Sequence, residues 1–412
     1  MKGEDHLENP PVADGEIPGT PDAAGLNRRA LKFVVLLGVV SLFADMTYEG
    51  ARSITGPFLA LLGASGAVVG FVAGFGELVG YGLRLASGYL ADRTGRYWGI
   101  TLFGYGLNLL AVPALALAGR WEVAALLMIL ERTGKAMRNP PRDVMLSHAT
   151  SRIGRGWGFG LHEALDQVGA VLGPLIAAGV LALHGSHREA FALLGVAAVL
   201  ALSTLVVARI SYPNPRDLEA EKSTARGAGL GRAFWLYLVA AALVAAGYAD
   251  FPLIAFRLQR ESIAAGAWIP VLYAIAMGVD ALAALVFGRL FDRFGLPVLA
   301  AAIVLSAAFA PLVFLGGFWL AVAGMVCWGV GMGAQESILR AAIADFVPAS
   351  RRGTAYGLFN AGYGISWFAG SALIGVLYDV SAGWLVAFSV AVQLAAVPVL
   401  LATRRLLGLR PG

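Results

Sequence analysis

Residues 88–97 read GYLADRTGRY, and residues 288–297 read GRLFDRFGLP. Each segment lies between two long apolar stretches, so each is predicted to form a short loop. Five pairs of identical residues share one offset of 200 positions: Gly88/Gly288, Leu90/Leu290, Asp92/Asp292, Arg93/Arg293 and Gly95/Gly295. The two segments therefore indicate a duplicated chain that carries the same loop in each half.

Two further echoes support this duplication. RGWGFGLHEA begins at Arg155 and RGTAYGLFNA begins at Arg352, with Arg, Gly, Gly, Leu and Ala recurring at an offset of 197. A weaker echo pairs residues 138 and 143 with residues 340 and 345, an Arg and an Asp five positions apart in each case. Three echoes in the same order argue for a repeated six-helix unit.

The composition is that of a polytopic membrane protein. The chain has 412 residues, of which 58% are hydrophobic and 14% are charged, whereas about 25% of the residues of a soluble protein are charged. The mean hydropathy is +0.73. Cys327 is the single cysteine in the sequence, which excludes an intramolecular disulfide.

Apolar stretches of about 18–25 residues are long enough to cross a bilayer as helices. The sequence predicts twelve such spans, at residues 31–60, 66–88, 98–118, 122–138, 158–183, 189–209, 233–256, 267–290, 297–316, 318–343, 354–378 and 383–403. We therefore expect an all-α membrane protein with twelve transmembrane helices in two pseudo-symmetric six-helix bundles.

Basic residues are concentrated in alternate loops, which predicts that both termini lie in the cytoplasm. The acidic N-terminus lacks the basic start and short apolar core of a secretory signal. A polar segment with two prolines, residues 211–232, is predicted to link the two halves. The expected domains are a disordered tail at 1–29, a bundle at 30–210, the linker at 211–232, a bundle at 233–405, and a tail at 406–412.

The loop at residues 88–97 resembles that of the major facilitator superfamily, whose motif between spans 2 and 3 is roughly G-x-L-(x)-D-R-x-G-R-(R/K). The residues that fit are Gly88, Leu90, Asp92, Arg93, Gly95 and Arg96. Tyr97 replaces the usual final basic residue. With the twelve spans and the repeat, the resemblance covers residues 30 to 405. It implies a transporter, with a central cavity lined by spans 1, 4, 7 and 10.

Charged residues and glycines in this loop can form a gate. Ion pairs at the rim of a bundle can latch two bundles in one state and release them in another, and glycines allow a tight turn. The alternative is a plain loop with anchoring charges. The predicted gating residues are Gly88, Asp92, Arg93, Gly95, Arg96, Asp292 and Arg293.

Span 5 contains a second pattern that resembles the family's antiporter motif, G-x-x-x-G-P-x-x-G-G. Gly169, Gly173 and Pro174 fit it, but Ala177 and Ala178 replace the last two glycines. In the family, this motif is associated with exporters that exchange substrate against protons. A stripe of small residues that only lets helices pack closely is the alternative.

Charged residues inside the spans are expected to face protein or water, because a charge at the bilayer centre costs a few kcal/mol or more. In SLFADMTYEGAR, residues 41–52, the spacing places Asp45, Glu49 and Arg52 on one helical face. The predicted residues for proton coupling and the substrate cavity are Asp45, Glu49, Arg52, Glu77, Arg84, His162, Glu163 and Asp166. Other charges in the spans are Glu131, Arg132, Lys135, Arg138, Asp250, Arg257, Asp280, Glu336 and Arg340.

These carboxylates have two possible roles. A cavity carboxylate that is alternately desolvated and set beside an arginine can bind and release a proton, and Asp45, Glu49 and Asp166 are the candidates. A static charge network that holds helices together is the alternative. His162 with Asp166 also suggests a transition-metal site completed by the span 1 carboxylates, or a catalytic pair. No cysteine cluster and no catalytic motif accompanies them, and we expect no bound metal or cofactor.

The predicted function is secondary active transport of a small solute by alternating access. The sequence has no nucleotide-binding P-loop, so an ion gradient is expected to drive transport. Proton-coupled efflux is preferred. The alternatives are a proton-coupled importer of an organic anion, a metal-ion exporter, or a non-transporting membrane sensor or enzyme. We expect a protein of the bacterial plasma membrane that binds no nucleic acid, and the resemblance implies a monomer.

Overall fold

The fold is known from a computed structural model, which describes residues 23–153, 155–218, 231–346 and 352–406. In these ranges every regular element is a helix. The elements of the first part are α1 (Ala23–Leu61), α2 (Gly66–Thr94), α3 (Tyr97–Ala114), η1 (Leu115–Leu117), α4 (Trp121–Ile153), α5 (Arg155–His184), α6 (His187–Ser211) and η2 (Pro215–Leu218). Those of the second part are α7 (Arg232–Gly247), α8 (Phe251–Arg260), α9 (Trp268–Phe294), α10 (Leu296–Ala307), α11 (Phe309–Leu315), α12 (Phe318–Phe346), α13 (Arg352–Val380) and α14 (Ala382–Leu406).

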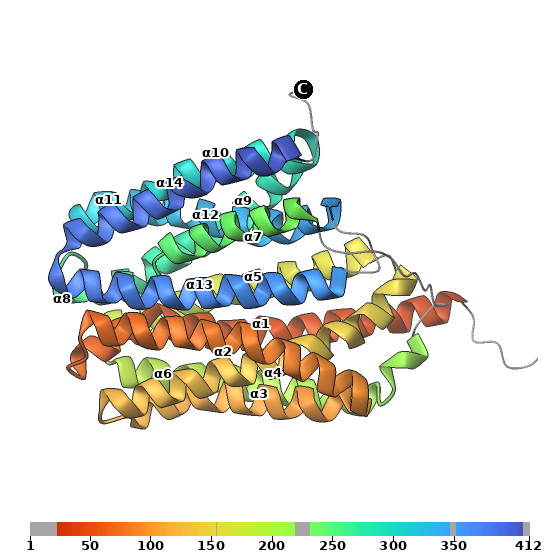
Figure 1. The fold of residues 1–412 in the computed structure, drawn as a ribbon. Helices are drawn as coiled ribbons and strands as arrows, with labels where there is room; N and C mark the ends of the chain where they lie inside the picture. The colour runs from red at the N-terminus through yellow and green to blue at the C-terminus, as the bar shows by residue number, and fades with distance from the viewer. Residues whose placement is uncertain (1–22, 154, 219–230, 347–351, 407–412) are drawn as a thin grey trace, which may run out of the picture.

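The helices run side by side and form two groups (Figure 1). In the first group α1 packs on α5 and α6, and α4 packs on α2 and α3. In the second group α12 packs on α9, α10 and α11, and α14 packs on α7 and α10. The groups meet where α1 contacts α8, α2 contacts α13 and α5 contacts α9. These pairs of facing helices, together with smaller contacts of α2 with α8 and α1 with α9, form the boundary between the halves.

Eleven helical segments of the described residues are long and apolar enough to cross a membrane. Two of these combine consecutive helices, α7 with α8 and α10 with α11. The remaining long helix is α4, with 33 residues. Its charged side chains lower its hydropathy, but it lies against α1, α2 and α3 in the same bundle. With α4 as the twelfth span, the predicted fold class of two six-helix bundles is confirmed.

The seventh span is not the continuous helix that the sequence predicts at 233–256. Residues 248–250 interrupt it, and α8 begins just before Pro252, which cannot donate a backbone hydrogen bond to the preceding turn. Side chains donate hydrogen bonds to the carbonyl groups that this break exposes. The Trp328 indole donates to the Ala249 carbonyl at 2.9 Å, and the Ser389 hydroxyl donates to the Gly247 carbonyl at 2.6 Å. The break is thus compatible with membrane depth.

The predicted span 5 motif lies against α1 of the same half. A Cβ atom on Gly169 would collide with the Leu42 carbonyl, and one on Gly173 with the Met46 carbonyl. Backbone therefore meets backbone along this contact, as small residues permit. This geometry supports the packing interpretation of the motif, and its role in transport stays a prediction.

The predicted gating loop joins α2 to α3, and its echo joins α9 to α10. Gly95 ends α2 with φ 66° and Gly295 ends α9 with φ 69°, a left-handed backbone that favours glycine. Arg93, Arg96 and Arg293 are exposed. The side chains of Asp92 and Asp292 are not described. Residues 219–230 of the predicted linker, residues 1–22 of the predicted N-terminal tail and residues 407–412 of the predicted C-terminal tail also lie outside the described residues. The latch role of the loop stays a prediction.

The α1/α5 contact predicts opposite effects for two substitutions in one helix. Gly173→Ala places a methyl group on the α1 backbone, and we expect it to lower stability by about 1–3 kcal/mol. Gly179 has open space at the same atom. Gly179→Ala should therefore be neutral, or stabilise by up to about 1 kcal/mol through helix propensity. Thermal unfolding in detergent measures both, and equal shifts would contradict this packing.

Candidate functional site

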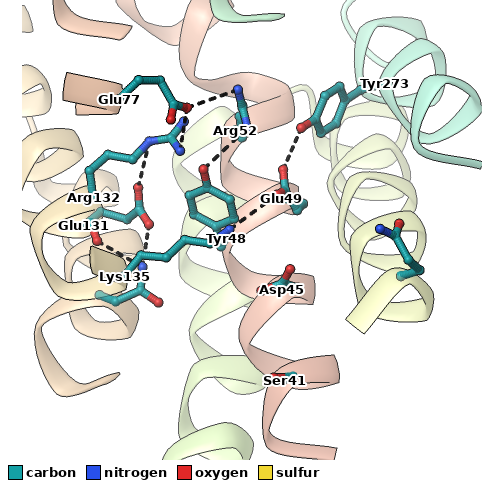
Figure 2. Close-up of polar contacts among 12 residues, drawn as sticks. Ser41, Asp45, Tyr48, Glu49, Arg52, Glu77, Glu131, Arg132, Lys135 and Tyr273 are labelled. Carbon is teal, nitrogen blue, oxygen red and sulfur yellow. Dashed lines mark hydrogen bonds and ion pairs between the residues drawn. The ribbon is translucent and has the colours of Figure 1, made fainter. Parts of the chain in front are cut away.

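One face of α1 contributes charged residues to the space between the halves. Asp45, Tyr48, Glu49 and Arg52 follow one another along it (Figure 2). Asp45 and Glu49 are 6% and 7% exposed, so neither carboxylate faces lipid. The face that the sequence predicts from spacing is therefore directed into the protein.

Arg52 joins carboxylates from both halves. Its Nη2 atom lies 2.9 Å from Asp250 Oδ1 and 3.5 Å from Glu77 Oε1. The same Glu77 Oε1 atom lies 2.8 Å from Arg132 Nη1. Asp250 lies at the start of α8, whereas Glu77 and Arg132 lie on α2 and α4. A chain of alternating charges therefore crosses the boundary between the bundles.

Asp250 is held by neutral donors as well as by Arg52. The Trp367 indole donates to its Oδ2 atom at 2.7 Å, and the Ser371 hydroxyl donates to the same atom at 3.2 Å. Both donors lie on α13. Because each carboxylate oxygen has a partner, Asp250 is stable as a buried anion beside Arg52.

Glu49 forms a second link between the halves. The Tyr273 hydroxyl of α9 donates to Glu49 Oε2 at 2.6 Å. Lys135 Nζ of α4 lies 3.7 Å from Glu49 Oε1 and 3.5 Å from the centre of the Tyr48 ring, in reach of a cation–π interaction. One carboxylate thus contacts a cation of its own half and a hydroxyl of the other half (Figure 2).

Asp45 and Glu131 belong to the interior of the first bundle. Asp45 Oδ1 lies 3.4 Å from Arg138 Nη2, and Arg138 is fully buried over the Tyr105 ring. Glu131 accepts a hydrogen bond from the Asn108 side chain. These pairs fix α4 against α1 and α3, and they lie behind the residues that connect the two halves.

A polar cavity of about 140 Å³ lies between the halves. Its charged lining consists of Glu49, Arg52, Glu77, Arg84, Arg132, Lys135 and Glu336. Its aromatic lining consists of Tyr48, Tyr81, Phe359, Tyr363 and Trp367. With Asp250 on Arg52, four carboxylates face four cations. The cavity can therefore bind both charged and aromatic groups of a small organic solute.

A second hollow of about 740 Å³ adjoins this cavity. We call it the vestibule. Arg84 and Glu336 line both spaces. Its other walls include Arg142 and Asp143 near the end of α4, and Glu163 and Asp166 near the start of α5. The vestibule therefore lies toward the end of the bundle where the α2–α3 loop is found.

The opposite end, where α1 ends and α2 begins, is closed. We call it the α1–α2 end. The Asp379 carboxylate of α13 accepts hydrogen bonds from the backbone N–H groups of Gly66 at 3.0 Å and Ala67 at 2.7 Å. These two N–H groups belong to the first residues of α2, and the dipole of a helix favours an anion at its N-terminus. A Cβ atom on Gly56 of α1 would collide with the Pro252 carbonyl of α8. The halves are thus joined at this end.

The predicted site residues divide among three places. Glu49, Arg52, Glu77 and Arg84 line the cavity. Glu163 and Asp166 line the vestibule instead. His162 lies outside both of these linings, and its Nε2 atom is 2.9 Å from Ser41 Oγ. Among the described residues, no three His, Cys, Asp or Glu side chains come together as a metal site.

Several cavity residues were not among the predicted site residues. Asp250 and Tyr273 come from the second half and meet partners in α1. Arg132 and Lys135 come from α4. A signal for α4 was present, because residues 131, 132 and 135 repeat at helical spacing in an apolar span. Tyr273 stands out in the sequence only as an aromatic residue near the expected cavity, and its hydrogen bond to Glu49 depends on tertiary neighbours that the sequence does not show.

Comparison with protein families and relatives identifies similar proteins over most of the chain. The family model described as the Major Facilitator Superfamily matches residues 37–261 and 251–411. An uncharacterized protein of Mycobacterium tuberculosis is 45% identical over 390 residues, which cover 92% of this chain and 95% of the relative. The multidrug resistance protein MdtH of Proteus mirabilis is 34% identical over 124 residues, which cover 30% of this chain and 31% of MdtH.

Among solved structures, the nucleoside transporter NupG superposes with a TM-score of 0.70 at 12% sequence identity. The match covers 92% of this chain and 100% of NupG. At this identity the likeness concerns the fold alone.

The Asp379 contact predicts how the α1–α2 end opens. We expect Asp379→Asn to weaken the link between the halves and to widen the distance between spin labels on Leu61 and Val380, measured after Cys327→Ala. The matched control is Glu189→Gln. This residue pairs with His184 at 3.0 Å at the same end but within one half, and its loss should leave the distance unchanged. Equal widening in both variants would contradict the predicted role of Asp379.

Proposed function

The chain belongs to the Major Facilitator Superfamily, and on that premise we propose that it exports a small organic solute in exchange for protons. It is a multi-pass membrane transporter and not an enzyme. In the proposed cycle, the cavity between the halves opens alternately to the two sides of the membrane. The proposed location is the plasma membrane of a bacterium, with both termini in the cytoplasm and the monomer as the working unit.

The observation that carries this proposal is the pair of links across the cavity, Arg52 to Asp250 and Glu49 to Tyr273. The residues that line the cavity also hold the halves together. A solute that binds there competes for the same groups, so its binding free energy changes the energy of separating the halves. This is the condition that alternating access requires.

The carboxylate at the link between the halves supports a proton as the coupling ion. Protonation of Glu49 would remove its attraction to Lys135 and weaken the link to α9. Arg52 would be affected in turn, because Lys135 lies over the Tyr48 ring and Arg52 donates to the Tyr48 hydroxyl. We therefore propose Asp45 and Glu49 as residues on which coupling depends.

Efflux is the proposed direction because of the likeness to MdtH, a multidrug resistance protein. The aromatic lining of the cavity suits planar organic solutes. An importer of an organic anion remains the second candidate, favoured by Arg84, Arg132 and Lys135 in one cavity wall. Guanidinium groups bind carboxylates and phosphates with two hydrogen bonds.

Transport in inverted membrane vesicles distinguishes these functions. Inverted vesicles are energised so that their interior becomes acidic and are loaded with a fluorescent pH probe, and ethidium and a panel of organic anions are added in turn. An exporter should accumulate solute inside inverted vesicles and release protons as it does so. An importer should accumulate solute only in vesicles of native orientation.

Two substitutions on α1 test the proposed coupling. We expect Asp45→Asn or Glu49→Gln to abolish solute-dependent proton movement, at least tenfold below the parent, while the protein still inserts and remains monodisperse. Glu122→Gln, at the start of α4 and away from the cavity, is the control and should retain full flux. Unchanged flux in both α1 variants would reject the proposed role.

A further inference from the structure

One deeply buried carboxyl group differs from the ion-paired carboxylates that connect the halves. Asp280 on α9 is 2% exposed. Its Oδ1 atom has no hydrogen-bond partner in the described part of the chain. None of the ion pairs found among the described residues includes it, although Glu49, Glu77 and Asp250 each have a cation within 4.0 Å. Asp280 therefore lacks the compensation that the others have.

The surroundings of Asp280 do not supply a cation in contact. Helix α9 packs on α12, α5, α10, α1 and α8. The charged groups near enough to act on Asp280 are Glu336 of α12, Glu163 of α5, and Glu49 and Arg52 of α1. Helix α10 carries no titratable residue, and Arg257 of α8 is engaged by the Val313 carbonyl. Three carboxylates and one guanidinium therefore act on Asp280 through space, and among the described residues no cation forms an ion pair with it.

Close packing of α9 against α12 explains why Asp280 is buried. A Cβ atom on Gly333 of α12 would collide with the Asp280 carbonyl, so the two helices touch backbone to backbone at this level. An unpaired carboxylate in such a place costs several kcal/mol, and a carboxyl group avoids that cost by binding a proton.

The vestibule nevertheless lies close to Asp280. The next residue, Ala281, lines the vestibule together with Ala284 and Glu336, and Glu336 also lines the central cavity. A small separation of α9 from α12 would bring the carboxyl group into contact with the vestibule. Asp280 is thus placed where it can be dry in one conformation and hydrated in another.

We propose that Asp280 carries the coupling proton, which it holds in the closed surroundings seen here and releases when α9 and α12 separate. This inference rests on the proposed proton-coupled transport. The step is the addition of one water-borne proton to a carboxylate oxygen, and its reversal, with no other bond made or broken. Glu49 of α1 then connects the halves without having to carry the proton itself.

Infrared difference spectroscopy of purified protein tests the proposal without a known substrate. The samples are kept at neutral pH in a maltoside detergent, which has no ester carbonyl. The difference between parent and Asp280→Asn should contain the C=O stretch of one protonated carboxylic acid, shifted in heavy water. Asp250→Asn is the control for a paired carboxylate, and its difference spectrum should contain only carboxylate bands.

Asp280→Glu guards against a variant that does not fold. It should move the carboxylic acid band without removing it. A difference spectrum for Asp280→Asn that contains only carboxylate bands would overturn the proposal. The absence of any lost carboxylic acid band in a folded Asp280→Asn variant would overturn it as well.

Ethidium-dependent proton flux in vesicles then separates this inference from the proposed function. Loss of flux in Asp280→Asn, with flux in the parent, supports both. Flux that persists in Asp280→Asn overturns the role of Asp280 and leaves proton-coupled export standing. If the parent moves no protons with any solute of the panel, the proposed function and the carrier role fail together, while the infrared result still reports the protonation of Asp280.

Discussion

The ion pair between Arg52 and Asp250 is the constraint on which the centre of this protein depends. Asp250 is buried at membrane depth, and removal of Arg52 would leave its charge without a cation at a cost of about 3–5 kcal/mol. The broken seventh span serves this pair. The break at residues 248–250 places Asp250 at the start of α8, where it meets Arg52 of α1 and the Trp367 indole of α13 together. Three helices from two halves are thereby fixed around one carboxylate.

The rest of the charged interior follows from the same requirement. Arg52 contacts Glu77, Glu77 contacts Arg132, and Lys135 contacts Glu49, so each of these charges has an opposite charge beside it. This explains why α4, alone among the described long helices, is too polar to qualify as a span by composition. Its cations neutralise the carboxylates of α1 and α2, and the bundle around it shields them from lipid.

The sequence predicts the fold and one side of the site, for identifiable reasons. Repeated loops and apolar lengths are local features, and they suffice for twelve helices in two halves. The α1 face follows from helical spacing alone. Asp250 and Arg52, however, are 198 positions apart, and no local pattern connects them. His162 was placed in the site because its neighbours are acidic, but helix rotation directs it to Ser41. The orientation of a helix within a bundle depends on packing that a single segment does not encode.

The position of Asp280 bears on how coupling can work. In the cavity four carboxylates face four cations, so a charged solute that enters must displace one partner of an existing pair. Asp280 stands outside these pairs and next to the vestibule wall. A proton and a solute therefore need not compete for one group. Their coupling can instead pass through the packing of α9 on α12, since Tyr273 at one level of α9 holds Glu49 and Asp280 at another meets Gly333. A shift of this one helix changes both contacts at once.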